Sequence, residues 1–110
     1  MAWGFFLSST KMLNLELNEI LHQANRTKIM TYLLGYGKTD YTQLKKNLEL
    51  SDGQMTTHMR VLLSNHYVEQ TKFFEQNKPK TVYEVSQLGR EEFLRYLANL
   101  KQILLHTQME

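Results

Sequence analysis

Apolar residues in the first third of the chain recur at steps of three and four positions, which is the period of one face of an α-helix. The pattern predicts a first amphipathic helix, whose apolar face comprises Leu13, Leu17, Ile20, Leu21 and Ala24. A second helical stripe follows at Ile29, Met30, Leu33 and Leu34. We expect Asn25 to cap this second helix, and Gly35 and Gly37 to end it with left-handed backbone positions.

Beyond the second stripe, a brief extended segment at 39–41 leads into a third, short helix. Asp40 and Gln43 have the spacing of a capping box, in which the first side chain accepts a hydrogen bond from a backbone N–H of the first turn. Leu44 and Leu48 lie four positions apart and therefore predict the buried edge of this helix.

A fourth helix has the clearest start signal in the chain. Ser51 and Gln54 form a second capping box. The apolar stripe that follows consists of Met55, Met59, Leu62 and Leu63. Only Glu49 and Leu50 separate the third helix from the fourth, and we expect Leu50 to lie in the core. Two short helices joined by so tight a turn predict a helix-turn-helix.

The period of the apolar residues then changes from about 3.6 to about 2. Segments 67–75 and 81–86 are rich in Val, Thr, Tyr and Phe, a composition that predicts strands. The polar residues 76–80 between them include Pro79, the only proline of the chain. We therefore expect a β-hairpin that carries a basic loop over 76–80.

Ser86 can cap a long last helix. The residues of its apolar stripe are Phe93, Leu94, Leu97, Ala98, Leu100, Ile103 and Leu104. One small core cannot cover this broad stripe together with that of the first helix. We expect the surplus to close a two-fold homodimer. The expected interface residues are Leu13, Leu17, Phe93, Leu97, Leu100 and Leu104.

Residues 1–12 precede these elements and carry the aromatic side chains of Trp3, Phe5 and Phe6. This stretch lacks the positively charged start and the small-residue cleavage pattern of a signal peptide. Exposed aromatic residues promote aggregation, so we interpret 1–12 as an arm that packs on its own subunit or on a partner. Residues 13–110 then form a single domain that includes the terminal dimerisation helix.

The order of the expected elements is helix, helix, short strand, helix, helix, hairpin, helix. It predicts a mainly α (α+β) fold, a winged helix-turn-helix with a two-stranded β-hairpin wing and a long C-terminal dimerisation helix. The sequences LHQANRTKIMTYLL, YTQLKKNLELSDGQMTTHMRVLLSNHYVE and KPKTVYEVSQLGREEF resemble single-domain winged-helix transcriptional regulators of the MarR/ArsR type. The resemblance covers roughly 14–105, with its most specific stretch at 48–68. It implies a dimeric repressor or activator that binds double-stranded DNA in a prokaryotic or archaeal cell.

The net charge is only +2, but the charge is unevenly distributed. Residues 26–80 contain nine Lys and Arg against five Asp and Glu, whereas the two flanks together are slightly acidic. The basic surplus thus lies where the helix-turn-helix and wing are expected, as a surface facing phosphates requires. No apolar run approaches the ~20 residues needed to cross a bilayer, and there is no cysteine. We expect a cytoplasmic protein that does not associate with a membrane.

Several residue types that serve DNA recognition are expected on the exposed face of the fourth helix. Arg60 can bind guanine and Gln54 can bind adenine through paired hydrogen bonds, while threonine offers a methyl group to thymine or a hydroxyl to phosphate. Gly53 would let the helix N-terminus approach a phosphate closely. The DNA-binding candidates of the helix-turn-helix are Ser51, Gly53, Gln54, Thr56, Thr57, Arg60, Lys45 and Lys46. Those of the wing, on the backbone or in the minor groove, are Lys72, Lys78 and Lys80.

Other polar residues admit two interpretations. His58 sits beside the buried stripe, so it is either a hydrogen-bonded structural residue or a phosphate contact. Arg26 is likewise either structural or a phosphate contact. The four histidines are scattered without a partner at ligand spacing, so we expect no metal site and no cofactor.

Catalytic motifs are also missing, so we do not expect an enzyme. The alternative function is a winged-helix module that binds protein or RNA without sequence-specific DNA recognition. No set of residues identifies a small-molecule effector.

Overall fold

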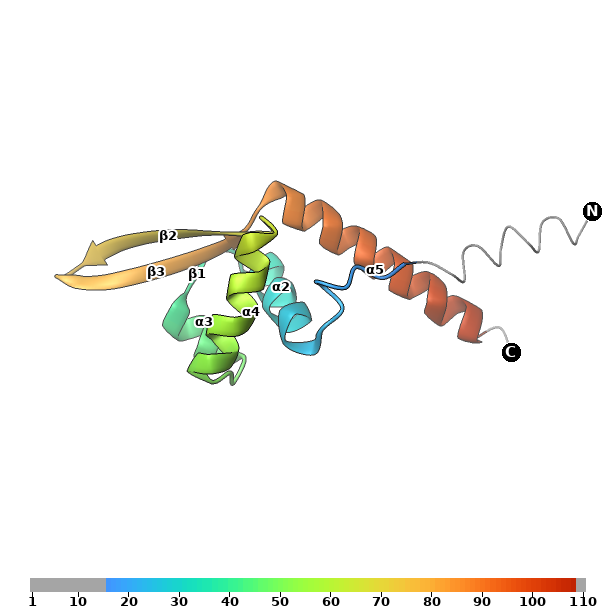
Figure 1. Ribbon diagram of the computed structural model, residues 1–110, viewed down its shortest axis with the longest axis horizontal. Helices are drawn as coiled ribbons and strands as arrows, with labels where there is room; N and C mark the ends of the chain where they lie inside the picture. Colours follow the sequence, from blue (N-terminus) through green and yellow to red (C-terminus); the bar gives the residue numbers. More distant parts are fainter. Residues whose placement is uncertain (1–15, 109–110) are drawn as a thin grey trace, which may run out of the picture.

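The computed structural model describes residues 16–108, in which helices and strands follow in the order expected for a winged helix-turn-helix (Figure 1). The predicted arm at 1–12 and Leu13 lie outside the described residues. The elements are α2 (Ala24–Tyr36), β1 (Thr39–Asp40), α3 (Tyr41–Asn47), α4 (Asp52–Ser64), β2 (Val68–Glu75), β3 (Lys78–Val85) and α5 (Gln87–Gln108). The predicted fold class, mainly α with a β-hairpin wing, is confirmed.

The described part of the predicted first helix is a turn rather than a helix. The Asn18 carbonyl accepts hydrogen bonds from the backbone N–H groups of Leu21 and His22, at 3.1 and 2.8 Å. The Asn18 side-chain oxygen also accepts from the N–H of Ile20, at 2.9 Å. An asparagine that bonds its own neighbouring backbone in this way competes with helix formation. The core still includes Leu21, and Leu17 and Ile20 pack against it. The spacing of these residues therefore predicted their burial correctly but predicted the wrong type of element.

The residues that begin and end helix α2 differ in part from those predicted. Its N-cap is Gln23, whose side-chain oxygen accepts from the Arg26 N–H at 2.9 Å, and the prediction of Asn25 was wrong. Glutamine is an uncommon cap, so pattern reasoning favours the nearby asparagine. At the other end Gly37 has a φ of +81°, whereas Gly35 lies inside the helix. Only one of the two glycines therefore supplies the positive φ.

The buried core is made by the inner faces of the helices together with the base of the sheet. Its members are Leu21, Ile29, Met30, Leu33, Leu44, Leu50, Met55, Met59, Leu62, Val68, Tyr83, Phe93 and Tyr96. The stripes predicted for the second and fourth helices are thus confirmed, as is the burial of Leu50. Because α3 and α4 each bury one edge in this core, their relative orientation is set by packing.

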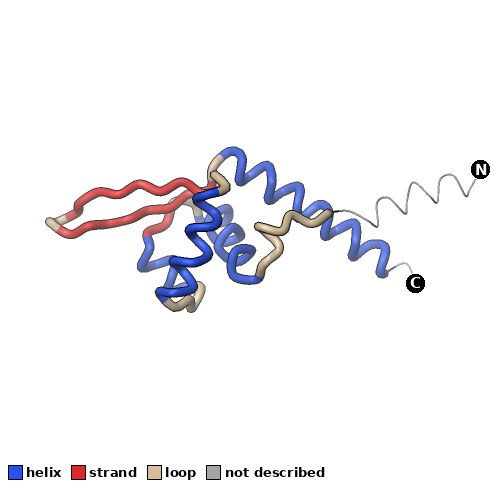
Figure 2. The backbone as a smooth tube through the Cα atoms, viewed as in Figure 1, coloured by secondary structure: helices blue, strands red, loops and turns tan. Residues whose placement is uncertain are grey.

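The sheet has the strand order β1-β3-β2, with all neighbours antiparallel. Strands β2 and β3 are eight residues each and extend as a finger away from the helices (Figure 2). The predicted loop at 76–80 was wrong, because only Gln76 and Asn77 form the turn, with φ values of +53° and +63°. Two positive φ values match the tight turn whose twist suits a hairpin.

Pro79 is consequently a strand residue, placed opposite Phe74. Proline cannot donate a hydrogen bond, so it is tolerated in a sheet only where its nitrogen faces no neighbouring strand. Strand β1 pairs with Val82 and Tyr83 of β3, so among residues 16–108 no strand faces that edge of β3 at Pro79.

Helix α5 starts at a tight contact with the base of the hairpin. The Ser86 hydroxyl accepts from the Gly89 N–H at 2.9 Å and donates to the His66 carbonyl, which confirms Ser86 as its cap. A Cβ atom on Gly89 would lie 2.0 Å from the Tyr67 carbonyl oxygen, so only glycine permits this approach. The C-terminal part of α5 runs away from the body of the domain (Figure 1). Within 16–108, no helix is both long enough and apolar enough to span a bilayer.

Candidate nucleic-acid interface

Helix α4 presents one apolar face to the core and one polar face to solvent. Met55, Met59 and Leu62 are buried, as predicted. All the residues predicted here to bind DNA are exposed, as is Asp52 beside them: Ser51, Gly53, Gln54, Thr56, Thr57 and Arg60. The helix can therefore be laid in a groove of a nucleic acid without disturbing the core.

The start of α4 is held by the predicted capping box. The Ser51 hydroxyl accepts from the Gln54 N–H at 3.1 Å, and the Gln54 side-chain oxygen accepts from the Ser51 N–H at 2.9 Å. The box rigidifies the first turn, but it engages the oxygen that a paired contact with adenine would use. In this conformation the Gln54 amide nitrogen is free for a base, whereas its oxygen already accepts one hydrogen bond.

Gly53 lies in the open first turn of α4. The nearest atom to a Cβ built on Gly53 would be the Ser51 hydroxyl oxygen, at 3.9 Å. The fold of the described chain therefore does not require glycine at this position. A glycine without an internal steric role leaves room for an external group beside the free N–H groups of the helix start.

A polar network that the sequence pattern did not reveal joins α3 to α4. The Asp52 carboxylate lies 2.8 Å from the Lys45 ammonium and accepts a hydrogen bond from the Tyr41 hydroxyl at 2.7 Å. The hydrogen bond from Lys45, then that from Tyr41, lowers the pKa of Asp52. The same hydrogen bond to Asp52 raises the pKa of Tyr41. Lys45, predicted to contact phosphate, is thus engaged inside the helix-turn-helix.

A shallow groove of about 310 Å³ runs between the outer side of α4 and the base of the sheet. Thr56 and Arg60 line it from the helix, and Tyr41 and Tyr83 line it from α3 and β3. Arg60 therefore lies where the helix and the wing meet. It makes no ion pair among the described residues.

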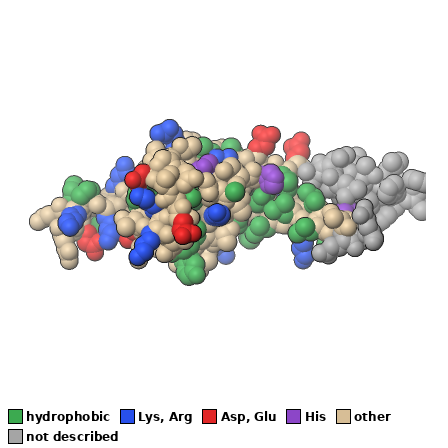
Figure 3. Space-filling view, turned by 90° about the horizontal axis from the view of Figure 1, so that it is seen from below, with side chains coloured by type: hydrophobic (Ala, Val, Ile, Leu, Met, Phe, Trp, Pro, Cys, Tyr) green, Lys and Arg blue, Asp and Glu red, His purple; other side chains and the backbone are tan. Residues whose placement is uncertain are grey.

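The three wing lysines are not equivalent. Lys80 lies 2.9 Å from the Glu75 carboxylate and 3.8 Å from that of Asp40, and the hydrogen bond to Glu75 raises the pKa of Lys80. Lys72 and Lys78 are exposed and make no ion pair within 16–108. Lys46 on α3 is also exposed and also makes no ion pair within residues 16–108. Figure 3 shows Lys and Arg side chains spread over the wing and the helical body.

Arg26 and His58 have structural contacts. The Arg26 side chain donates to the Ile20 carbonyl at 2.5 Å and lies 3.1 Å from the His58 ring nitrogen Nδ1. Burial, and secondly the charge of Arg26, lowers the pKa of His58. These contacts tie the turn at 18–21 and α2 to the middle of α4. Of the two interpretations left open for each residue, the structure favours the structural one.

The residues predicted for a dimer interface divide into two groups. Phe93 is 1% exposed in the core of the single chain, so its assignment to an interface was wrong. The helical period that marked Phe93 as apolar cannot tell the inner edge of a broad stripe from the outer one. Leu17 and Leu100 are partly buried against the core, whereas Leu97 and Leu104 are exposed. Exposed leucines that we did not single out for the interface are Leu88, Leu94 and Leu105.

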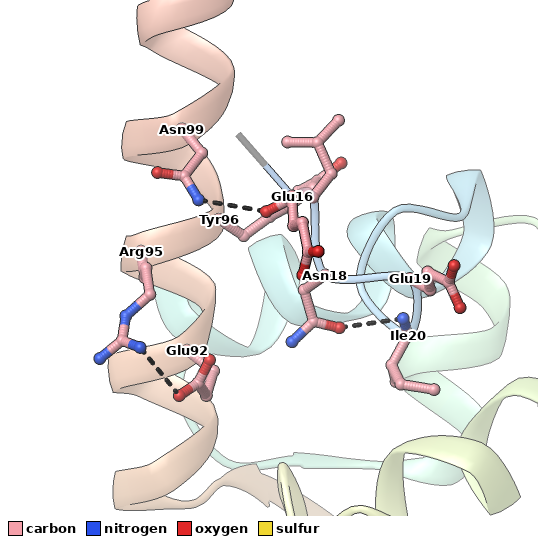
Figure 4. A pocket seen from close by; sticks show the side chains of 9 residues that line it. Glu16, Asn18, Glu19, Ile20, Glu92, Arg95, Tyr96 and Asn99 are labelled. Carbon is pink, nitrogen blue, oxygen red and sulfur yellow. Dashed lines mark hydrogen bonds and ion pairs between the residues drawn. The ribbon is translucent and has the colours of Figure 1, made fainter. Parts of the chain in front are cut away.

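A cavity of about 590 Å³ lies between segment 16–20 and α5 (Figure 4). Two contacts join residues of its lining: Arg95 pairs with Glu92 at 3.9 Å, and the Asn99 side chain donates to the Glu16 backbone carbonyl at 3.4 Å. Across the described residues, no three His, Cys, Asp or Glu side chains are grouped so as to hold a metal ion. The candidate interface with nucleic acid lies on the exposed faces of α4 and the wing.

Comparison with known proteins places this geometry in a family. The family described as winged helix DNA-binding domain matches residues 25–104. An uncharacterized protein of Methanocaldococcus jannaschii is 28% identical over 85 residues, covering 77% of this chain and 92% of that protein. A transcriptional regulator homologue from Pyrococcus horikoshii OT3 is 34% identical, with a TM-score of 0.77 over 82% of this chain and 89% of that one.

A more distant structure, overoxidized AbfR bound to DNA, has a TM-score of 0.60 at 12% identity and covers 93% of this chain and 72% of that chain. At this identity the likeness concerns the fold alone. The match over 25–104 spans well over half of the chain and agrees with the predicted resemblance to winged-helix transcriptional regulators. The chain therefore belongs to the winged helix DNA-binding domain family.

Proposed function

We propose that the chain is a homodimeric regulator of transcription that binds double-stranded DNA in a sequence-specific manner. The observation that carries the proposal is the exposed polar face of α4, mounted on a capped helix within a helix-turn-helix. In this arrangement α4 lies in the major groove, and the wing follows the backbone or the minor groove. The DNA-bound state of AbfR, a structure of the same fold, supports the choice of partner.

The side chains of the interface take different roles in this proposal. Arg60, free of ion pairs in the described chain, reads guanine, while Thr56 and Thr57 contact thymine methyl groups or phosphates. Ser51 and Gly53 bring the start of α4 to a phosphate. Lys46, Lys72 and Lys78 neutralise phosphates without reading bases. Lys45 and Lys80 contribute less, because each already faces a carboxylate.

The exposed leucines of α5 support a homodimer. Leu94 is 53% exposed in the first half of α5, and Leu104 is 60% exposed in the second half, which extends beyond the body of the domain. An isolated helical segment gains most of its stability from packing of its apolar face, so this half requires a partner. A second copy of the chain offers a matching leucine surface across a two-fold axis. Such a dimer places two α4 helices in successive major grooves, about 34 Å apart.

Selection of duplexes from a random DNA pool tests the proposal. We expect an enriched sequence with two symmetric half-sites whose centres are about 10 base pairs apart. Its affinity should fall steeply as salt rises and should exceed that for a scrambled duplex by about 10³-fold or more. A pool without enrichment, together with salt-insensitive or absent duplex binding, would favour the protein- or RNA-binding alternative.

A further inference from the structure

An exposed apolar pair sits at the far end of the wing, outside the core formed by the described residues. The Phe74 side chain is 76% exposed, and its direct partner across the hairpin is Pro79, which is also exposed. The core ends at the base of the hairpin, with Val68 and Tyr83. An exposed phenylalanine on a hairpin exposes apolar area to water and invites edge association. Its presence there calls for an external partner.

The surroundings of this pair are basic. Opposite residues of an antiparallel hairpin share a face, and so do residues two positions apart. Lys72 and Thr81 therefore lie on the same face as Phe74 and Pro79, one pair closer to the body. Lys78 borders Pro79 in sequence and lies opposite Glu75 on the other face of the hairpin. Neither Lys72 nor Lys78 forms an ion pair in the described chain. The partner of the apolar pair is thus a surface that also carries negative charge.

The hairpin that carries Phe74 and Pro79 is stiff. All eight positions of β2 are paired with β3, and the connecting turn is only Gln76 and Asn77. Proline restricts its own backbone to a narrow range of φ, which stiffens the strand behind Phe74. The face that carries Phe74 is the one that packs on the helices at its base, through Val68 and Tyr83.

We propose that Phe74, supported by Pro79, is an apolar wedge that enters the minor groove of bound duplex DNA and partly unstacks one base step. This inference rests on the proposed DNA binding and adds its mode. Phenylalanine and proline are among the side chains that proteins insert between base steps, and such insertion kinks the duplex. Lys72 and Lys78 would neutralise the phosphates on either side of the wedge. The cost of unstacking is smallest at flexible pyrimidine–purine steps, so these steps are expected beneath the wing.

The experiment uses the full chain and a duplex of about 30 base pairs recovered from the random pool. 2-Aminopurine is placed at successive positions of this duplex, and dyes at its two ends report bending by energy transfer. We expect the wild type to raise 2-aminopurine fluorescence at one step in each half-site and to shorten the end-to-end distance. Phe74→Ala should bind the same duplex while losing both signals, and Phe74→Leu, which keeps an apolar wedge, should retain them.

Tyr36→Ala is the matched control, because Tyr36 is an equally exposed aromatic residue, at 78%, at the end of α2. It should leave both signals unchanged. Wild-type binding without unstacking or bending would overturn the wedge and leave the DNA-binding proposal intact. Equal loss of signal in Tyr36→Ala would also overturn it. Failure of the wild type to bind any duplex would overturn both the proposed function and the wedge.

Discussion

The Lys45 ammonium group lies 2.8 Å from the Asp52 carboxylate, so that an ion pair joins α3 to the first residue of α4. The pair stands at the edge of the surface that we propose faces DNA. The ion pair neutralises the Lys45 charge that would otherwise attract a phosphate, and it places the negative charge of Asp52 near the proposed DNA. The contact joins α3 to the start of α4 at the expense of attraction to DNA.

Asp52→Asn should therefore strengthen binding to all duplexes, because Lys45 becomes free to meet a phosphate. The slope of log affinity against log salt should steepen by about one unit for the added phosphate contact. Fluorescence anisotropy at several salt concentrations measures this slope. Glu91→Gln removes one negative charge from α5 and serves as the control, since it should leave the slope unchanged. An Asp52→Asn protein with the wild-type slope would contradict the assignment of Lys45.

Gly53→Ala tests the approach of the start of α4 to DNA. Alanine fits the fold, because a Cβ meets only the Ser51 hydroxyl oxygen at 3.9 Å, so the chain should remain at least as stable. Duplex binding should weaken by about 1.5–3 kcal/mol, the value of a hydrogen bond to a charged group. Gly35→Ala in α2 is the matched control, since nothing lies within 4 Å of its Cβ position and Gly35 lies outside the helix-turn-helix formed by α3 and α4. Equal DNA affinity of both variants would place the phosphate elsewhere.

The proposed dimer predicts the effect of charges on the α5 surface. Leu97 and Leu104 are seven residues apart, hence on one face of the helix, and both are exposed. Leu97→Asp combined with Leu104→Asp should give a folded monomer that loses specific DNA binding. Arg95→Asp changes the net charge by the same amount on the opposite side of the helix and should leave the dimer intact. Sedimentation of the wild type as a monomer at micromolar concentration would show that α5 does not join two copies.

The Arg26–His58 contact predicts how stability depends on pH. The folded pKa of His58 is lowered by burial and by Arg26, so the unfolded chain takes up a proton more readily. Stability should then fall as the pH drops from about 6.5 toward the folded pKa. His58→Gln should make this part of the profile flatter in urea denaturation at successive pH values, whereas His106→Gln should not. Identical profiles for wild type and His58→Gln would refute the contact.

Local signals in the sequence predicted most of the fold because a few neighbouring residues encode them. The Ser51–Gln54 box and the Asp40 cap each depend on residues three positions apart, and both are present. The turn at Asn18 was missed because an asparagine can bond its own backbone inside a sequence with helical spacing. The turn at Gln76 and Asn77 was missed because glutamine rarely adopts a positive φ, which made a longer loop around Pro79 the natural interpretation.

The electrostatics of the site could not be predicted in the same way. Lys45 and Asp52 meet only because two helices pack against each other, and Lys80 reaches Asp40 only because β1 lies beside β3. A sequence pattern can predict that a lysine lies on the surface, but it cannot predict which acidic residue the lysine contacts. The structure thus separates Lys72 and Lys78 from Lys45 and Lys80, which the sequence treats alike.

The central claim is that α4 reads bases while the wing holds the backbone. It is tested by titrating the selected duplex and a scrambled duplex of equal composition with wild type, Arg60→Ala and Lys78→Ala. Arg60→Ala should lose about 1–3 kcal/mol on the selected duplex and almost nothing on the scrambled one. Lys78→Ala should weaken binding to both duplexes equally and lower the salt slope by about one unit. A Lys78→Ala protein with altered sequence preference, beside an Arg60→Ala protein with the wild-type preference, would contradict the account.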